Sequence, residues 1–298
     1  MRWIRSTQPN LEVNRLFRRA LLVTFLGNLL LAGIKIVAAH MSGSTAVYTD
    51  AINSISDVLY SILLMVGLWM ATRPPDISHP QGHSRFEPFA ALLITLSMTA
   101  AGAEALRASI QRGLQGVAAI PLGIAMAALL VSMLIKAVMF AVVHRISKRT
   151  VSPGLGAAAK DNLSDVATSL AALLGILGSN FIHPMLDPLA GLLVALWIFK
   201  TVVSTARENL GYLTGAGADE ALRNTILETA RNTPGVEDVH HVITEYAGPR
   251  LVVEMHINVN GDISLTNAHK ICDQAAAALE ALPEVDRAYV HVEPLGYL

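Results

Sequence analysis

The sequence predicts an α-helical membrane protein with six transmembrane helices, followed by a separate α+β domain. Three observations carry this prediction. Hydrophobic residues make up 53% of the 298 residues and charged residues only 15%, against the roughly 25% charged residues of typical soluble domains. Six apolar runs are long enough for a helix to cross a bilayer core of about 30 Å. Polar residues return from Glu208 onward, and no later run is long enough to span.

Charge balance and cysteine content exclude several classes of protein. The chain carries 22 Lys and Arg residues against 23 Asp and Glu residues, so it lacks the basic excess with which proteins bind nucleic acid. The low charged fraction also excludes intrinsic disorder and a coiled coil. A single cysteine, Cys272, excludes a disulfide framework and a CxxC zinc or redox motif. Any metal site must therefore use His, Asp, Glu or Asn.

The six runs define the expected domain boundaries. We expect a cytoplasmic N-terminal segment at 1–15, a transmembrane domain at 16–207 and a cytoplasmic domain at 208–298. The first run is too long for a secretory signal and no small-residue cleavage pattern ends it, so it should remain as a helix. The expected spans are 17–39, 44–71, 88–108, 118–143, 158–180 and 186–206.

Basic residues predict the orientation in the membrane. They cluster before the first span, after the second span and between the fourth and fifth spans, for example at Arg18, Arg73 and Arg149. The opposite loops carry almost none. The positive-inside rule then places both termini in the cytoplasm, and we expect a multi-pass protein of the cell (inner) membrane, embedded in the lipid bilayer.

The C-terminal domain alternates helix and strand patterns. Residues 219–232 and 264–281 are rich in helix-forming residues, whereas alternating apolar and polar residues predict strands at 250–260 and 286–293. With a short strand at 236–246, the element order is αββαβ. This order predicts an antiparallel sheet covered on one face by two helices.

Two pairs of polar side chains lie within spans, where ionisable groups are rare and usually functional. The second span contains Asn53 and Asp57, and the fifth contains Asp161 and Asp165. Residues four apart share one helix face, so two facing helices would offer four oxygen-bearing side chains to one divalent cation. The alternative is that these residues are polar helix starts near the membrane interface. One pair alone would not decide between the two interpretations, and the presence of two pairs favours the ion site.

Other charges near the spans need no role in binding an ion. Lys35, Lys136, Glu104 and Asp187 are single charges, and ion pairing or snorkelling to the interface explains them at least as well as ion binding does. Asp50 lies about one helical turn before the pair Asn53 and Asp57, and we interpret it as a structural or access-path residue.

Six short motifs follow one another along the chain: Ser42-Gly43-Ser44, the stretch from Asp50 to Asp57, the stretch from His79 to Glu87, Asp161 to Asp165, Asp187-Pro188 and His291-Val292-Glu293-Pro294. In this order they resemble the cation diffusion facilitator family. Each motif is weak alone, but together they extend over nearly the whole chain. The resemblance implies six spans, a cytoplasmic ferredoxin-like domain, a homodimer and export of a divalent metal cation. Because carboxylates bind metal only when deprotonated, we expect exchange of metal for protons by alternating access.

The resemblance places the transport site at Asn53, Asp57, Asp161 and Asp165. Zinc-moving members usually have His in one or both pairs, whereas neither pair contains His here. Oxygen ligands suit harder cations such as Mn²⁺, and imidazole favours Zn²⁺. We therefore expect Mn²⁺ as the transported cation, with Fe²⁺, Co²⁺ and Zn²⁺ as alternatives.

A second metal site is implied in the cytoplasmic loop after the second span. The resemblance assigns it to Asp76, His79 and His83, whose spacing shares one face if the loop begins as a helix. The two histidines also lie beside Pro80 and Gly82, so a structural role in turns is an equally supported interpretation.

The resemblance implies further metal ligands in the C-terminal domain. His256 shares a strand face with Glu254, which gives independent support, although a lone strand histidine is more often solvated. His241 competes with its neighbour His240 as a ligand, and the sequence does not rank them. The implied ligands are His240, His256, His269, His291 and Glu293.

Three rival functions stay open at this point. A zinc-selective transporter or a non-transporting metal-sensing scaffold would share the fold and the motifs. An intramembrane aspartyl protease also needs two membrane aspartates, but its Gly-x-Gly-Asp element is matched only by Gly215-Ala216-Gly217-Ala218-Asp219, which has an extra residue and lies outside the spans. The expected protein is therefore a secondary transporter and not an enzyme.

Overall fold

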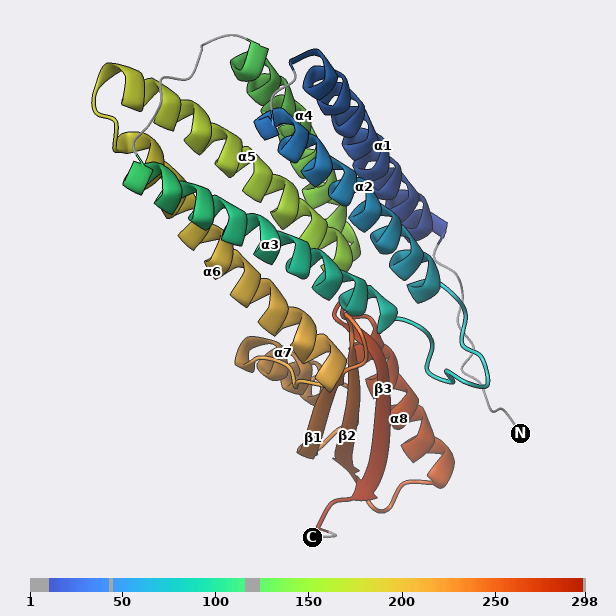
Figure 1. Cartoon of the computed structure of the whole chain (residues 1–298). Helices are drawn as coiled ribbons and strands as arrows, with labels where there is room; N and C mark the ends of the chain where they lie inside the picture. Colours follow the sequence, from blue (N-terminus) through green and yellow to red (C-terminus); the bar gives the residue numbers. More distant parts are fainter. Residues whose placement is uncertain (1–10, 43–44, 116–123, 297–298) are drawn as a thin grey trace. The chain divides into compact units, whose positions relative to one another are not determined.

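Six long helices belong to the first of two compact units. The computed structural model describes residues 11–42, 45–115 and 124–296, and the chain divides into a unit up to Asn209 and a unit from Leu210. Within the described residues, six helices contain an apolar stretch long enough to cross a membrane, so the predicted transmembrane helices are confirmed. The helices, shown in Figure 1, are α1 (Leu11–Ser42), α2 (Thr45–Ala71), α3 (Phe86–Gln115), α4 (Ile124–Thr150), α5 (Pro153–Phe181) and α6 (Leu186–Thr214).

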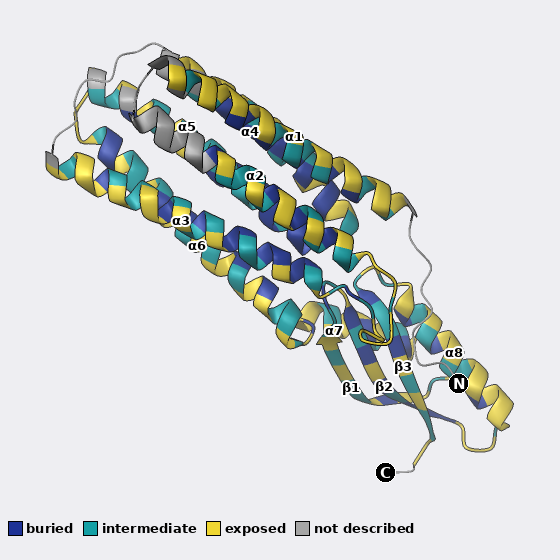
Figure 2. Cartoon of the chain, turned by 45° about the vertical axis from the view of Figure 1, so that its right-hand side comes forward, coloured by how far each residue is buried: buried dark blue, intermediate teal, exposed yellow. Residues whose placement is uncertain are grey.

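Small residues allow the closest helix contacts of this unit. Helix α1 contacts α2 and α4, α3 contacts α2 and α5, and α4 contacts α5. Gly67 on α2 lies so near α3 that an added Cβ would stand 2.4 Å from the Cβ of Ala90. Such residues let helix backbones approach closely in a membrane. Figure 2 shows the buried residues along the faces that the helices turn toward one another.

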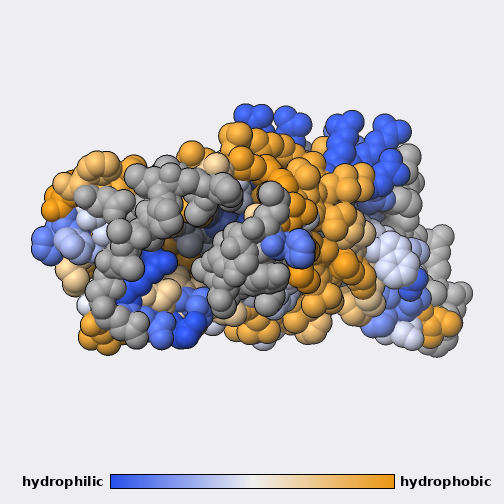
Figure 3. All heavy atoms as spheres, turned by 45° about the horizontal axis from the view of Figure 1, so that its top comes forward, coloured by the Kyte–Doolittle hydropathy of each residue, from blue (hydrophilic) through white to orange (hydrophobic). Residues whose placement is uncertain are grey.

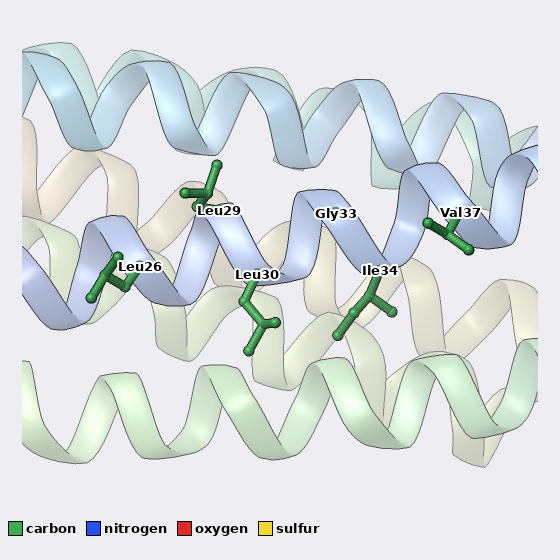
Figure 4. A pocket seen from close by; sticks show the side chains of 6 residues that line it. All are labelled: Leu26, Leu29, Leu30, Gly33, Ile34 and Val37. Carbon is green, nitrogen blue, oxygen red and sulfur yellow. The ribbon is translucent and has the colours of Figure 1, made fainter.

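The outer surface of the helices is apolar. Figure 3 shows hydrophobic residues over the sides of the helices in that view. On α1, large apolar side chains such as Leu26, Leu30 and Val37 are exposed. They border a shallow groove that contains no polar side chain, so this face fits contact with lipid and not passage of an ion. Figure 4 shows the lining residues Leu26, Leu29, Leu30, Gly33, Ile34 and Val37.

The start of α5 is fixed against α3 by a buried polar cluster. The hydroxyl of Ser152, the N-cap residue of α5, donates a hydrogen bond to the buried carboxylate of Glu87 on α3. That carboxylate also accepts a hydrogen bond from the backbone N–H of Gly154 at 3.3 Å. Because a helix is rigid, this anchor sets the direction in which α5 presents the expected ligands Asp161 and Asp165.

The second unit is an α+β domain with a mixed sheet. The strands lie in the order β1-β2-β3; β1 and β2 pair antiparallel, whereas β2 and β3 pair parallel. The predicted α+β class is confirmed, but the expectation of an antiparallel sheet is wrong. The chain crosses over through α8 between β2 and β3, and such a crossover makes the joined strands parallel. The elements are α7 (Glu220–Arg231), β1 (Asp238–Tyr246), β2 (Leu251–Val259), α8 (Leu265–Glu280) and β3 (Val285–Pro294).

The two faces of this sheet differ in chemistry. Met255 and Ile257 of β2 are fully buried and belong to one core with Ile226 of α7 and Leu279 of α8. Successive side chains of a strand point to opposite faces. His256 therefore lies on the face that the two helices leave uncovered, and this face carries the histidines of the domain's strands.

Candidate metal sites

Two of the predicted transport ligands meet at one buried lysine. The Nζ of Lys136 on α4 lies 2.9 Å from Oδ2 of Asp57 on α2 and 2.6 Å from Oδ2 of Asp165 on α5. The first of these contacts is also a hydrogen bond that the ammonium donates. The lysine side chain is only 6% exposed. Acidic groups of α2 and α5 thus converge as the sequence predicts, and a cation of the chain itself lies between them.

The other two expected ligands differ in what can be said of them. Asp161 lies one turn before Asp165 on α5, and its charge acts on Asp57, Asp165 and Lys136. The side chain of Asn53 lies outside the described residues, although its backbone belongs to α2. Three carboxylates and one ammonium therefore form the described part of this cluster, which we call the transport cluster: Asp57, Lys136, Asp161 and Asp165.

Neighbouring polar residues hold the backbone of Asp57. The Asn28 amide on α1 donates to the Ser61 hydroxyl at 2.8 Å and to the Asp57 carbonyl at 3.3 Å. Ser61 in turn donates to the Asp57 carbonyl at 2.7 Å. These bonds tie α1 to α2 at the level of the carboxylate. Asn28 and Ser61 were not predicted from the sequence, although an amide in the middle of an apolar span was a signal for such a role.

Glu104 and Asp187, two further single charges near the spans, form ion pairs with arginines. Glu104 pairs with Arg107 at 2.7 Å, and Asp187 pairs with Arg112 at 2.8 Å. Pairing was the expected explanation for these residues, and it also describes Lys136. Its pairing with two of the predicted transport ligands, Asp57 and Asp165, was not predicted from the sequence. Its position within the long apolar run of α4 was the available signal, because an unpaired ammonium there would be costly.

The loop between α2 and α3 gathers its three expected ligands. One ligand atom from each of Asp76, His79 and His83 lies within 4.8 Å of the others. The His83 side chain is 6% exposed, and its Nδ1 has no hydrogen-bond partner among the described residues. A carboxylate, two imidazoles and an unsatisfied buried nitrogen fit the donor set of a divalent transition metal.

Turns, and not a helix, bring these loop residues together. The Asp76 carboxylate accepts a hydrogen bond from the His79 backbone N–H at 2.7 Å, and Gly82 adopts a positive φ of 107°, which favours glycine. The hydrogen bond from His79 lowers the pKa of Asp76, and the nearby histidines lower it further. The loop does not begin as a helix, so turns and not a shared helix face bring the three residues together. This geometry is compatible with both the ligand and the structural interpretation.

The open face of the sheet holds a cluster of histidines around one carboxylate. Oxygens of Glu293 lie 3.3 Å from His240 Nε2, 3.2 Å from His256 Nδ1 and 3.5 Å from His291 Nε2. His240, His256 and Glu293 are near enough to hold one ion together. Four of the five expected ligands thus come from β1, β2 and β3 to one place.

His269 is the expected ligand that lies apart from the others. It stands on α8, where it is 73% exposed and contacts Asp273 at 3.6 Å. The family resemblance implied that His269 binds metal together with the strand histidines. Within the chain, the helices occupy the opposite face of the sheet, so His269 does not join the cluster around Glu293.

A bulge in β1 explains why His240 and His241 both approach His256. Adjacent residues of a regular strand point to opposite faces, but the pairing of β1 with β2 shifts between Val239 and His241. Such a bulge re-aims side chains. The ring centroids of His240 and His241 lie 5.5 Å and 4.6 Å from that of His256, and His241, Glu254 and His256 form a second possible ligand group.

Two family models match the chain, one in each of its two units. The family model described as the cation efflux transmembrane domain matches residues 21–214, and that of the cation efflux protein cytoplasmic domain matches residues 218–295. The chain belongs to the cation diffusion facilitator family. Membership confirms a metal cation transporter at the level of the family, and it supports neither a protease nor any other enzyme. The second model is named for dimerisation, so the family assignment includes a homodimer.

Relatives of this cation diffusion facilitator span both of its units. An uncharacterized transporter of Methanocaldococcus jannaschii is 35% identical over 279 residues, which cover 92% of this chain and 97% of the relative. The manganese efflux system protein MneS of Bacillus subtilis is 27% identical, covering 92% and 94%. The magnetosome protein MamM of Paramagnetospirillum magneticum is 29% identical, covering 85% and 80%. The similarity therefore extends along almost the full length of the described fold.

Proposed function

We propose that this chain exports a divalent metal cation, preferentially Mn²⁺, in exchange for protons. The observation that carries the proposal is the convergence of Asp57 and Asp165 from two different helices on one cationic group. With Asp161 beside them and Asn53 on the same helix as Asp57, these residues supply only oxygen atoms to a cation. An oxygen-only set suits Mn²⁺ better than Zn²⁺.

The choice of metal has a second source of support. One relative is named as a manganese efflux system protein, and it aligns over most of the chain. Fe²⁺, Co²⁺ and Zn²⁺ are the alternatives, because availability and site geometry also decide which divalent ion a protein binds. A zinc-selective transporter is the runner-up within the same fold.

Proton exchange follows from the chemistry of the ligands. Carboxylates bind a divalent cation only when deprotonated, so metal and protons compete for the same oxygens. Each pH unit contributes about 1.4 kcal/mol per proton, while moving one net positive charge outward against 100 mV costs about 2.3 kcal/mol. An exchange of two protons for one metal ion moves no net charge, so the membrane potential does not oppose it.

Alternating access would expose the transport cluster to each side of the membrane in turn. In this proposal α2 and α5 move relative to the other helices. The protein lies in the cell (inner) membrane with both termini in the cytoplasm, and its C-terminal domain pairs with that of a second copy in a homodimer. Metal held by the loop ligands or by the histidines around Glu293 biases the equilibrium between states only through a difference in affinity. The fit of these donor sets to a divalent metal supports such a regulatory role.

A flux assay with purified protein in proteoliposomes tests the proposal. We expect Mn²⁺ uptake coupled to proton movement, faster than uptake of Fe²⁺, Co²⁺ or Zn²⁺, and its loss in Asp57→Ala and in Asp165→Ala. Glu104→Ala is the matched control, since it removes an acidic group of a spanning helix that pairs with Arg107 instead. Wild-type flux in both aspartate variants would contradict the proposal.

The same assay distinguishes a non-transporting metal-sensing scaffold. Such a protein would bind Mn²⁺ through the cytoplasmic histidines and show no flux of any of the four cations. Faster flux of Zn²⁺ than of Mn²⁺ would instead identify a zinc-selective transporter of this fold.

A further inference from the structure

Lys136 has an unusual place among the charges of the spanning helices. Its ammonium contacts one oxygen of Asp57 on α2 and one oxygen of Asp165 on α5. A divalent cation bound by these two aspartates would need the same region of space. A lysine ammonium is a compact charge on a flexible four-carbon stem, so it has both the charge to replace a cation and the freedom to withdraw.

The charges of the transport cluster support more than a structural ion pair. A purely structural lysine needs one acidic partner, whereas Lys136 also experiences the charge of Asp161. With all three carboxylates ionised, the cluster carries a net charge of about −2, which one divalent cation neutralises. The lysine therefore leaves enough negative charge to attract a divalent ion while it occupies the oxygens that the ion needs.

We propose that the Lys136 ammonium is a tethered counter-cation, which occupies the transport site when no metal is bound and is displaced from Asp57 and Asp165 by the incoming cation. This inference rests on the proposed function, because it assumes that these aspartates bind the transported metal.

Two consequences follow from the displacement. In the empty carrier, Asp57 and Asp165 are not left as unpaired charges in a medium of low dielectric constant, where they would be costly. In the loaded carrier, the ammonium competes for the same oxygens and so weakens metal binding. A transporter needs such a limit on affinity, because an ion that binds too tightly is not released.

The test measures equilibrium binding of Mn²⁺ and of Zn²⁺ to the purified full-length protein. The transport-site signal is the part of the binding that Asp165→Ala abolishes. We expect Lys136→Met to tighten this part by about tenfold or more, equivalent to about 1.4 kcal/mol, and to slow metal release in the flux assay. Lys136→Arg keeps a positive charge, and the planar guanidinium can bind a carboxylate through two hydrogen bonds at once. We therefore expect Lys136→Arg to bind metal more weakly than the wild type does.

Lys35→Met is the matched control for a general effect of charge. Lys35 lies on α1, and its positive charge interacts with the Asp57 carboxylate. Lys136 is the lysine whose ammonium contacts both Asp57 and Asp165. We expect Lys35→Met to change the affinity much less than Lys136→Met does. Equal tightening by both variants would overturn the displacement model, because a nearby charge alone would then explain the effect.

Loss of folding is checked by thermal unfolding with and without Mn²⁺. We expect Lys136→Met to be less stable without metal and to gain more in Tm on adding metal than the wild type gains.

If Lys136→Met does not fold, the metal affinity of Lys136→Arg tests the inference. An affinity of Lys136→Arg equal to or above that of the wild type overturns the inference. If Asp165→Ala abolishes binding but Lys136→Met leaves affinity unchanged, this inference fails alone. If Asp165→Ala changes neither binding nor flux, the proposed function fails, and the inference fails with it.

Discussion

Arg112 on α3 pairs with Asp187 at the start of α6, with Nη1 and Oδ2 2.8 Å apart. The carboxylate side chain is 3% exposed and the guanidinium side chain 50% exposed. The site is also tightly packed, because a Cβ added to Gly175 of α5 would lie 2.7 Å from Oδ1 of Asp187. This ion pair therefore joins α3 to α6 at a point where α5 also touches the carboxylate.

Loss of this ion pair should destabilise the helical unit. Arg112→Ala leaves a buried carboxylate without its cation, and we expect a loss of about 1 to 2 kcal/mol, reduced from the value for a fully buried pair because the arginine is half exposed. Arg107→Ala is the control, since Arg107 is 63% exposed and pairs with the 47% exposed Glu104. Its loss should be below about 1 kcal/mol. Thermal unfolding in detergent measures both, and equal Tm values for the two variants would contradict the prediction.

Asp161→His should shift the preference of the transporter from Mn²⁺ toward Zn²⁺. The substitution replaces a carboxylate of the transport cluster with an imidazole, which favours Zn²⁺ over harder cations. We expect the ratio of Zn²⁺ to Mn²⁺ uptake in proteoliposomes to rise by about tenfold. Asp161→Asn serves as the comparison, because it removes the same charge but keeps an oxygen donor. A rise of equal size in both variants would attribute the change to charge and not to the type of ligand.

Glu293→Gln should weaken metal binding by the C-terminal domain of the full-length protein. Glu293 is the carboxylate that contacts His240, His256 and His291. Losing even an outer-shell partner of a metal ligand weakens affinity by on the order of 10- to 100-fold, so losing this carboxylate should weaken it by at least as much. His269→Ala is the control, since His269 stands apart on α8. Calorimetric titration in an Asp57→Ala, Asp165→Ala, His83→Ala background isolates this binding, because the background also removes a ligand of the candidate loop site. If His269→Ala alone weakens it, the ligands come from a different arrangement, such as one shared between protomers.

Cys272 should react slowly with thiol reagents at neutral pH. Burial raises the pKa of its thiol, and the charge of Asp273 raises it further; the thiol also donates to the Val290 carbonyl at 3.0 Å. Only the thiolate reacts, so the alkylation rate should keep rising with pH above the ordinary cysteine pKa of about 8.5. Asp273→Asn should accelerate the reaction only modestly, because burial is the larger cause. Unfolded protein is the reference, and an equal rate in the folded protein would contradict the prediction.

Much of the fold was predictable because its signals are local. Each spanning helix needs only a sufficiently long apolar run, and the strands of the second unit show their alternation within a few residues. The direction of β3 was not predictable in the same way. Its partner and orientation depend on the crossover through α8, and this relationship involves residues far apart in the chain.

In the candidate sites too, local features were predictable from the sequence, whereas contacts between distant residues were not. The ligand types in α2 and α5 were readable from the sequence, as were the loop histidines. The bridging contact of Lys136 was not, because a lysine within an apolar run indicates only that some partner exists. Likewise, the bulge after Val239 decides that His240 and His241 both approach His256, and a bulge leaves no clear pattern in the residues themselves.

The amino-acid sequence alone determined that the chain is a membrane protein with six long apolar helices, and which oxygen and nitrogen donors its helices and strands carry. Periodicity and composition carry this information because they act over one or two turns. The tertiary structure decided which charges meet: Lys136 with Asp57 and Asp165, Arg112 with Asp187, and Glu293 with its histidines. These pairings depend on the lateral packing of helices and the register of strands, which are set by contacts between distant residues and not by local pattern.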